Sequence, residues 1–350
     1  MVGFRWAIEP VSIPPSAAGR RLWPRREVRR RPVGRALHTA REINSRFGGG
    51  RLTINPSVQY SRDIIIAKGA FHVPPHILRI DCPDEPGLVH KITGVLFNAG
   101  YNILSNQEFV DLDAKHFFMR TAFEGPTAPD RVVSYLQQIL PADSVVKLVE
   151  AERQPIVILA TTEAHCLGDL LIRHYSGELP AQIKAVVANH ETLGDLVKPF
   201  GIPFHCVSHK DLDRAEHERR VLEVIDGYAP EYLVLAKYMR ILTPSFVAHY
   251  RNRVINIHHS FLPAFIGAKP YHQAYERGVK IIGATAHIVT DDLDTGPIIA
   301  QNIIPVNHTY TAAAMVQAGR DAEKIALARA VRLMLDERVF LHGNRTVVFE

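Results

Sequence analysis

Short apolar segments rich in β-branched residues alternate with helix-length segments along the second half of the chain, and this alternation restricts the fold more than any other feature. Strand-like segments occupy 156–160, 183–188 and 204–207, and another begins at Tyr232. Because such alternation joins parallel strands through right-handed crossovers, we expect an α/β fold with a doubly wound, mostly parallel sheet. Ligands bind outside the carboxyl ends of the strands in sheets of this kind.

Polar side chains stand at the ends of two later strands. Asn256 is on the predicted strand 253–257 and His258 directly follows it, two residues after Asn256, so both face the same side of the sheet. The predicted strand 281–289 ends in an acidic turn that can bring Asp294 back to that face. An amide donor, an imidazole base and a carboxylate that orients the base are suited to acyl transfer. We therefore predict Asn256, His258 and Asp294 as catalytic residues.

These residues also carry a family resemblance. The run from Asn256 through His258 to Leu262-Pro263, with Asp294 in a Leu-Asp-x-Gly-Pro setting, resembles the formyltransferase family that handles 10-formyltetrahydrofolate. The resemblance covers residues 154–350, which we expect to form a formyltransferase-like catalytic domain. The folate-binding residues predicted with it are Met239, Arg240, Ile241, Leu242, Thr290 and Asp291.

The first turn of this domain bears on the formyl acceptor. Residues 161–168 lead into a helix expected to begin near Leu167, and they include Glu163 but no glycine before Gly168. A phosphate binds at a helix N-terminus where glycines let the backbone approach it. The relative that formylates glycinamide ribonucleotide has a glycine- and asparagine-rich loop here, so the sequence disfavours a phosphorylated acceptor. The alternative that phosphate is held elsewhere stays open, for instance by Lys269 or Arg277.

Residues 76–150 have the pattern of a small, separate α+β unit. Its first predicted helix has apolar positions at helical spacing and ends at Gly100, where a positive φ suits glycine. Strand segments at 77–80, 103–104 and 117–123 and a second helix at 129–140 complete it. The unit resembles an ACT domain. ACT domains usually pair and bind small effectors, which implies a homo-oligomer and a possible amino-acid effector; an oligomerisation module without a ligand remains the alternative.

An ACT domain joined to a folate formyl domain without the phosphate loop resembles the formyltetrahydrofolate deformylase family, in which water replaces the amine. The resemblance implies an enzyme that hydrolyses 10-formyltetrahydrofolate, a linear amide, to formate and tetrahydrofolate in one-carbon metabolism that supports purine biosynthesis. Two alternatives stay open: a formyltransferase acting on an amine such as glycinamide ribonucleotide, and a non-catalytic folate-binding regulator. Which of His258 and Asp294 takes the first proton is also open, because the two titrate as a coupled pair.

No cofactor or metal is expected, since the folate is the substrate and the histidines do not follow the closely spaced patterns of zinc sites. Three widely separated cysteines favour a reducing compartment, which with the absence of an apolar run of membrane-spanning length indicates a cytoplasmic enzyme without a membrane partner.

The basic character of the chain is concentrated at its start. Residues 1–60 contain twelve arginines, no lysine and three acids, a net charge of +9, whereas the whole chain carries +5. The remainder is therefore mildly acidic, which disfavours nucleic-acid binding by the folded part. We expect residues 1–70 to be a disordered basic tail, produced by a start codon upstream of the true one near Gly69. The alternative is a transit peptide, which would make the enzyme mitochondrial.

Overall fold

The computed structural model describes residues 75–125, 130–150, 153–264 and 270–350. The chain divides into two units, Met1–Lys68 and Gly69–Glu350, and every described residue belongs to the second. The predicted tail, residues 1–70, lies outside the described residues, as does Lys269. In the part of the chain that is described, each helix is too short or too polar to cross a bilayer.

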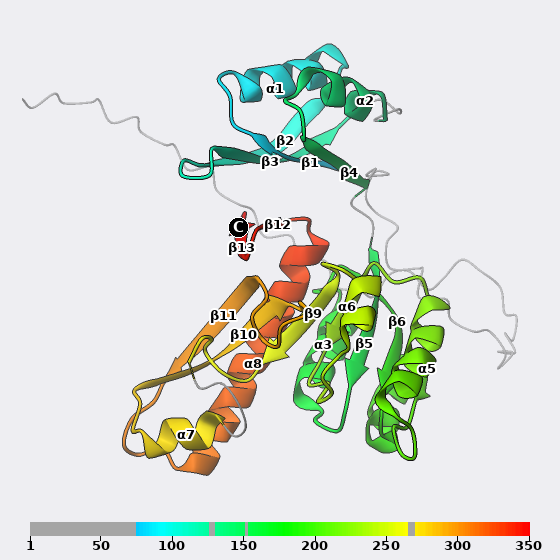
Figure 1. Cartoon of the computed structure of the whole chain (residues 1–350), viewed down its shortest axis with the longest axis vertical. Helices are drawn as coiled ribbons and strands as arrows, with labels where there is room; N and C mark the ends of the chain where they lie inside the picture. Colours follow the sequence, from blue (N-terminus) through cyan, green and yellow to red (C-terminus); the bar gives the residue numbers. More distant parts are fainter. Residues whose placement is uncertain (1–74, 126–129, 151–152, 265–269) are drawn as a thin grey trace, which may run out of the picture. The chain divides into compact units, whose positions relative to one another are not determined.

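Six elements form the first domain (Figure 1): β1 (His76–Pro83), α1 (Leu88–Asn98), β2 (Asn102–Asp111), β3 (His116–Glu124), α2 (Asp130–Ile139) and β4 (Val145–Glu150). The strands make an antiparallel sheet in the order β2-β3-β1-β4, and both helices lie on one face of it. Leu88, Ile92 and Leu96 of α1 are buried against that face, as their helical spacing predicts. This is the architecture expected of an ACT domain.

The second domain is built on a seven-stranded sheet in the order β11-β10-β9-β8-β5-β6-β7. In chain order, its first elements are β5 (Gln154–Ala160), α3 (His165–Ser176), β6 (Ala181–Ala188), η2 (Glu191–Leu193), α4 (Gly194–Val197), η3 (Lys198–Phe200), β7 (Phe204–Cys206), α5 (Arg214–Asp226), β8 (Tyr232–Leu235), α6 (Pro244–His249) and β9 (Val254–His258). The remaining elements are α7 (Pro270–Glu276), β10 (Ile281–Ile288), β11 (Ile298–Pro305), α8 (Ala312–Leu335), β12 (Val339–His342) and β13 (Arg345–Val348).

Five neighbouring strands of this sheet, from β9 to β7, run parallel, and β10 and β11 pair antiparallel at its other edge. Successive residues of β5 enter opposite cores: Ile156 and Ile158 pack on the side of α3 and α8, and Val157 and Leu159 on the side of α5 and α6. A strand buried on both faces needs this continuous apolar run. The doubly wound, mostly parallel α/β sheet is therefore confirmed, with helices on both faces (Figure 1).

The C-terminal residues form a hairpin, β12 and β13, that contacts the ACT domain. Phe118 of β3 packs with Phe340 and Phe349 in a small aromatic cluster. Beside it, the guanidinium of Arg79 lies 2.5 Å from the carboxylate of Glu337 and donates to the Val339 carbonyl at 2.6 Å. The sequence did not predict this hairpin, because neither of its short strands has a long enough periodic pattern.

Candidate active site

A cavity of about 450 Å³ opens at the carboxyl ends of β8 and β9. Its walls are residues 237–242 after β8, 256–259 at the end of β9 and 289–294 after β10, together with Leu235 and His287. These segments are far apart in the sequence, and the order of the strands brings them together. The cavity therefore lies at the strand ends where a doubly wound sheet binds its ligand.

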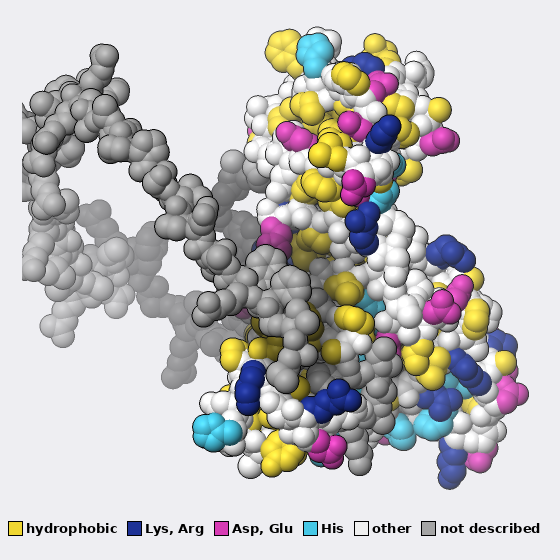
Figure 2. All heavy atoms as spheres, turned by 60° about the vertical axis from the view of Figure 1, so that its left-hand side comes forward, with side chains coloured by type: hydrophobic (Ala, Val, Ile, Leu, Met, Phe, Trp, Pro, Cys, Tyr) yellow, Lys and Arg dark blue, Asp and Glu magenta, His cyan; other side chains and the backbone are white. Residues whose placement is uncertain are grey.

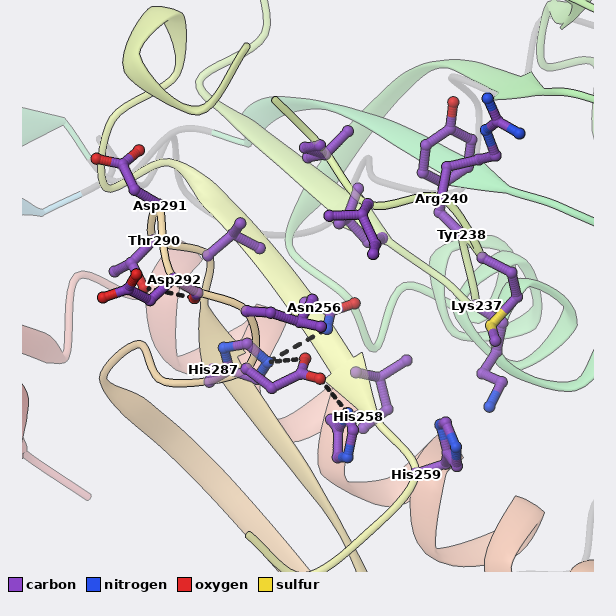
Figure 3. A pocket seen from close by; sticks show the side chains of 18 residues that line it. Lys237, Tyr238, Arg240, Asn256, His258, His259, His287, Thr290, Asp291 and Asp292 are labelled. Atoms are coloured by element: carbon purple, nitrogen blue, oxygen red, sulfur yellow. Dashed lines mark hydrogen bonds and ion pairs between the residues drawn. The ribbon is translucent and has the colours of Figure 1, made fainter. Parts of the chain in front are cut away.

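The three predicted catalytic residues all line this cavity, and Figure 3 labels two of them, Asn256 and His258. The Nδ1 atom of His258 lies 3.1 Å from Oδ2 of Asp294, and both side chains are largely buried. The amide nitrogen of Asn256 lies 3.2 Å from Nε2 of His287, whose ring is 3.5 Å from the other oxygen of Asp294. Asn256 and Asp294 are thus linked by a fourth residue, His287, which contacts both of them.

His287 is the member of the site that the sequence did not indicate as functional. It lies on β10 directly opposite Asn256, because β9 and β10 pair antiparallel in that register. Its Nδ1 is 2.9 Å from the carbonyl of Ile288, which can only accept, so Nδ1 carries a proton and Nε2 faces Asn256 and Asp294. The signal that could have revealed it is the strand pairing, which no local periodicity encodes.

The acidic residue of the site is held ionised. Burial opposes the ionisation of Asp294, but the hydrogen bonds and charges of His258 and His287 outweigh burial and keep the pKa of the carboxyl well below its ordinary value. With Nδ1 of His258 directed at this carboxylate, Nε2 is the free ring nitrogen. That atom is buried, and none of the described residues hydrogen-bonds to it. The second ring nitrogen of His258, a residue that lines the cavity, is thus left without a hydrogen-bond partner among the described residues.

The loop after β10 is shaped to present Asp294. Its base is closed by a hydrogen bond of 2.9 Å from the Ile288 amide to the Pro297 carbonyl. A Cβ atom on Gly296 would lie 1.9 Å from the Ile288 carbonyl oxygen, so only glycine fits at this position. Asp294 itself has φ 56°, a left-handed conformation that Asp tolerates better than most residues.

The predicted folate-binding residues also line the cavity. Met239 and Ile241 are 58% and 60% exposed, and together with Arg240 and Leu242 they form one wall. Thr290 and Asp291 lie on another wall. Thr243, next in the chain, caps α6 by accepting from the Phe246 amide. The segment after β8 therefore lines the cavity and also leads into α6.

The turn that would bind phosphate in the related transferase has no such character here. Helix α3 begins at His165, and Glu163 lies just before it, 3.6 Å from Nδ1 of that histidine. Of the described cavity walls, only Lys237 and Arg240 contribute cations, and Lys237 is already 3.2 Å from the carboxylate of Glu323. Arg277 is not a lining residue.

One group among the described residues has the spacing of metal ligands: donor atoms of His165, Cys166 and Glu323 lie within 4.8 Å of one another. Burial, followed by the charge of Glu323, raises the pKa of the Cys166 thiol above its ordinary value, so the thiolate form needed to bind a metal is disfavoured. The ammonium of Lys237 already neutralises the Glu323 carboxylate. This environment is poorly suited to a metal ion.

Comparison with known proteins gives two family models and several close relatives. The formyl transferase model matches residues 154–331, and the ACT domain model matches residues 76–138. Formyltetrahydrofolate deformylase of Haemophilus influenzae is 57% identical over 272 residues, which are 78% of this chain and 98% of the relative. The protein of the same name from Escherichia coli K12 is 56% identical, with 78% and 97% covered.

Solved structures agree with these matches. A formyltetrahydrofolate deformylase from Pseudomonas syringae pv. tomato superimposes with a TM-score of 0.77 at 38% identity, over 80% of this chain and 96% of the other. A glycinamide ribonucleotide transformylase from Symbiobacterium toebii covers 57% of this chain, with a TM-score of 0.54 and 27% identity. Since the relatives with both domains match almost along their whole length, the chain belongs to the formyltetrahydrofolate deformylase family.

Proposed function

We propose that this chain hydrolyses 10-formyltetrahydrofolate to formate and tetrahydrofolate, with water as the formyl acceptor. The names of its relatives and the joining of an ACT domain to a formyl transferase domain support this activity. The observation that carries it is the pairing of His258 with the ionised Asp294 in a cavity, at 3.1 Å, with Nε2 of the imidazole free. A positioned base of this kind can activate a water molecule.

The mechanism assigns one task to each side chain. Nε2 of His258 takes a proton from water as its oxygen attacks the formyl carbon, and Asp294 stabilises the imidazolium that results. The Asn256 amide has a second N–H, which donates to the formyl oxygen as negative charge develops on it. When the C–N bond breaks, the imidazolium returns the proton to N10 of the folate. Because Asp294 is held ionised, it is the poorer proton acceptor of the pair.

The same proposal places the folate against the two walls described above. Met239, Arg240, Ile241 and Leu242 would hold the pterin between exposed apolar side chains and backbone groups, and Thr290 and Asp291 would contact it from the facing loop. Side chains alone supply this chemistry, so we propose that the reaction uses neither a metal nor a cofactor.

The test is formate release from 10-formyltetrahydrofolate by the purified chain without any amine. Many equivalents of formate per protein are expected. Release that requires glycinamide ribonucleotide would instead identify a formyltransferase. Folate binding without any turnover would identify a regulator.

The ACT domain is proposed to pair with a second copy and to bind a small amino acid. Strand β2 lies at the edge of the described sheet, and Phe97 and Leu112 are 78% and 81% exposed. Figure 2 shows hydrophobic side chains on the surface of this domain. Light scattering would give the oligomer size, and thermal shift measurements with glycine and methionine would test two candidate effectors.

A cytoplasmic location and a role in supplying formate to purine biosynthesis complete the proposal. The relatives named above come from bacteria. Fractionation of cells that express the full chain, probed with an antibody against the catalytic domain, would distinguish the cytoplasm from the mitochondrion.

A further inference from the structure

A buried lysine lies at the end of the cavity away from the Thr290–Asp291 wall. Lys237 follows β8, lines the cavity and is 6% exposed. In Figure 3, Lys237 and His259 lie on the opposite side of His258 from Asp291. The charge of this lysine contributes, after burial, to lowering the pKa of His259 to about 4. Lys237 therefore lies close to the neighbouring imidazole rings of His258 and His259.

The partner of this lysine is a carboxylate that two other side chains also contact. Glu323 of α8 has a side chain 2% exposed, and its Oε2 lies 3.2 Å from Nζ of Lys237 and 2.8 Å from Nε2 of His165. Its other oxygen accepts from the Tyr271 hydroxyl at 2.9 Å. Burial opposes its ionisation, but these partners lower the pKa of Glu323 to about 2. The Lys237–Glu323 pair is thus charged and held in place from several sides.

Further charged side chains of alternating sign lie between the Lys237–Glu323 pair and the surface. His165 and Arg320 each lie 3.6 Å from Glu163, and Lys237 lies 4.0 Å from the same carboxylate. An anionic molecule that approached along this path would meet Glu163 and then Glu323. The cations along it are already paired, so no free positive charge is available to bind a phosphate.

The backbone of Lys237 adopts an uncommon conformation for a lysine. Its φ is 62°, in the left-handed region that glycine adopts readily and that costs other residues about 1 kcal/mol or more. A glycine at this position would therefore relieve the strain without requiring the backbone to move.

We propose that Lys237, held by Glu323, fills the acceptor side of the active site, so that water can reach the formyl carbon and a larger amine cannot. Lys237 is therefore a specificity-determining residue, and this inference rests on the proposed hydrolysis. Without the lysine side chain, an amine nitrogen would take the place of water. It would form the bond to the formyl carbon and lose a proton to His258, and N10 of the folate would leave with that proton.

The experiment compares the products formed by variants of the full chain. Lys237→Gly opens the space at a position whose φ suits glycine, and Glu323→Gln weakens the hold on the lysine while keeping its shape. Each is incubated with 10-formyltetrahydrofolate and glycinamide, a small amine without a phosphate group, and formate and the formylated amine are measured. We expect wild type to yield formate alone. Both variants should raise the ratio of formylated amine to formate by at least about tenfold, with the larger rise in Lys237→Gly.

The matched control is Lys115→Gly, since Lys115 also has a positive φ, 51°, and is exposed on the turn before β3. It should behave as wild type. Formate as the sole product from both folded variants would overturn the inference while leaving the hydrolysis intact. Failure of wild type itself to turn over without amine would instead refute the proposed function. Thermal unfolding establishes that each variant is folded, and Glu323→Gln alone decides the question if the glycine variant is not.

Discussion

His258 shows how a single side chain is divided between two tasks. Nδ1 lies 3.1 Å from the carboxylate of Asp294, and Nε2 is buried without a hydrogen-bond partner among the described residues. The carboxylate sets which nitrogen keeps its proton, so the lone pair of the imidazole is on Nε2. The role of each atom in this arrangement is set by its neighbours and not by the residue type.

Replacing Asp294 with Asn should lower kcat by about a thousandfold or more, because the amide can neither fix the imidazole tautomer nor stabilise the imidazolium. Folate affinity should change by only a few fold, as measured by fluorescence titration. Asp195→Asn is the control and should retain activity, because Asp195 is exposed on α4 and does not line the cavity. An equal loss of binding and turnover in Asp294→Asn would mean that the aspartate mainly maintains the loop.

The environment of His259 predicts a dependence of stability on acidity. Burial and the charges of Lys237 and His258 lower its pKa from 6.5 to about 4. Between these values the unfolded chain binds a proton that the folded chain does not, so stability falls as the pH drops from 6.5 to 4 and is unaffected by this group above that window. The slope reaches at most about 1.4 kcal/mol per pH unit for one proton.

His259→Gln should therefore flatten the loss of stability between pH 6.5 and pH 4, as measured by urea unfolding midpoints at several pH values. Carboxylates such as Glu323 add a separate loss at lower pH, since its pKa falls from 4.5 to about 2 on folding. That part should persist in the variant. Parallel curves for the variant and wild type would show that His259 is not the titrating group.

At the scale of elements, the active site depends on the pairing of β9 with β10 and on the loop that follows. Antiparallel pairing places His287 opposite Asn256, and the closed loop returns Asp294 to the same point. Gly296 keeps the loop base closed, since its missing side chain leaves room for the Ile288 carbonyl.

Gly296→Ala should therefore displace the loop and lower kcat by about a hundredfold, the size of effect expected when a catalytic group moves by about 1 Å. Gly168→Ala is the matched control: nothing lies within 4 Å of its added Cβ, and the residue is in α3, where alanine should stabilise by about 0.5–1 kcal/mol. Steady-state kinetics and thermal unfolding of both proteins measure the outcome. Unchanged turnover in Gly296→Ala would mean that the loop accommodates the methyl group without moving Asp294.

The sequence predicted the elements whose patterns are local. Periodicity predicted the alternation of strands and helices and the burial of Leu88 and Ile92 on one helix face. It also predicted that Asn256 and His258 share one side of the sheet. His287 and Glu323 could not be predicted in this way, because their roles arise from strand register and from contacts across long sequence separations. The elements β4, α7 and β12 were also not predicted.

At the scale of the whole molecule, the described residues of the ACT and catalytic domains are joined through the C-terminal hairpin. Glu337, 2% exposed, is bound by Arg79 at 2.5 Å and by Lys147 at 3.0 Å. Arg79 also stacks on the Phe340 ring, 4.2 Å from its centroid. A buried ion pair of this kind contributes little net stability when intact but is costly to break.

Arg79→Met should lower stability by about 3 kcal/mol, since it leaves the buried Glu337 with one cationic partner, and should make the two domains unfold in separate transitions. Differential scanning calorimetry measures both effects. Arg345→Met is the control, because Arg345 is 71% exposed and pairs with Asp111 at 3.1 Å across the same contact. Its loss should cost less than about 1 kcal/mol. Equal effects of the two substitutions would show that burial of Glu337 does not govern the contact.

The last residues of the chain lie where the domains meet: Gln107 donates to the backbone carbonyl of Glu350 at 2.9 Å, and Arg329 pairs with its side chain. A purification tag or fluorescent fusion appended after Glu350 would therefore be attached next to these contacts with Gln107 and Arg329. Any measurement of effector response made with such a fusion should be repeated after the added polypeptide has been cleaved away.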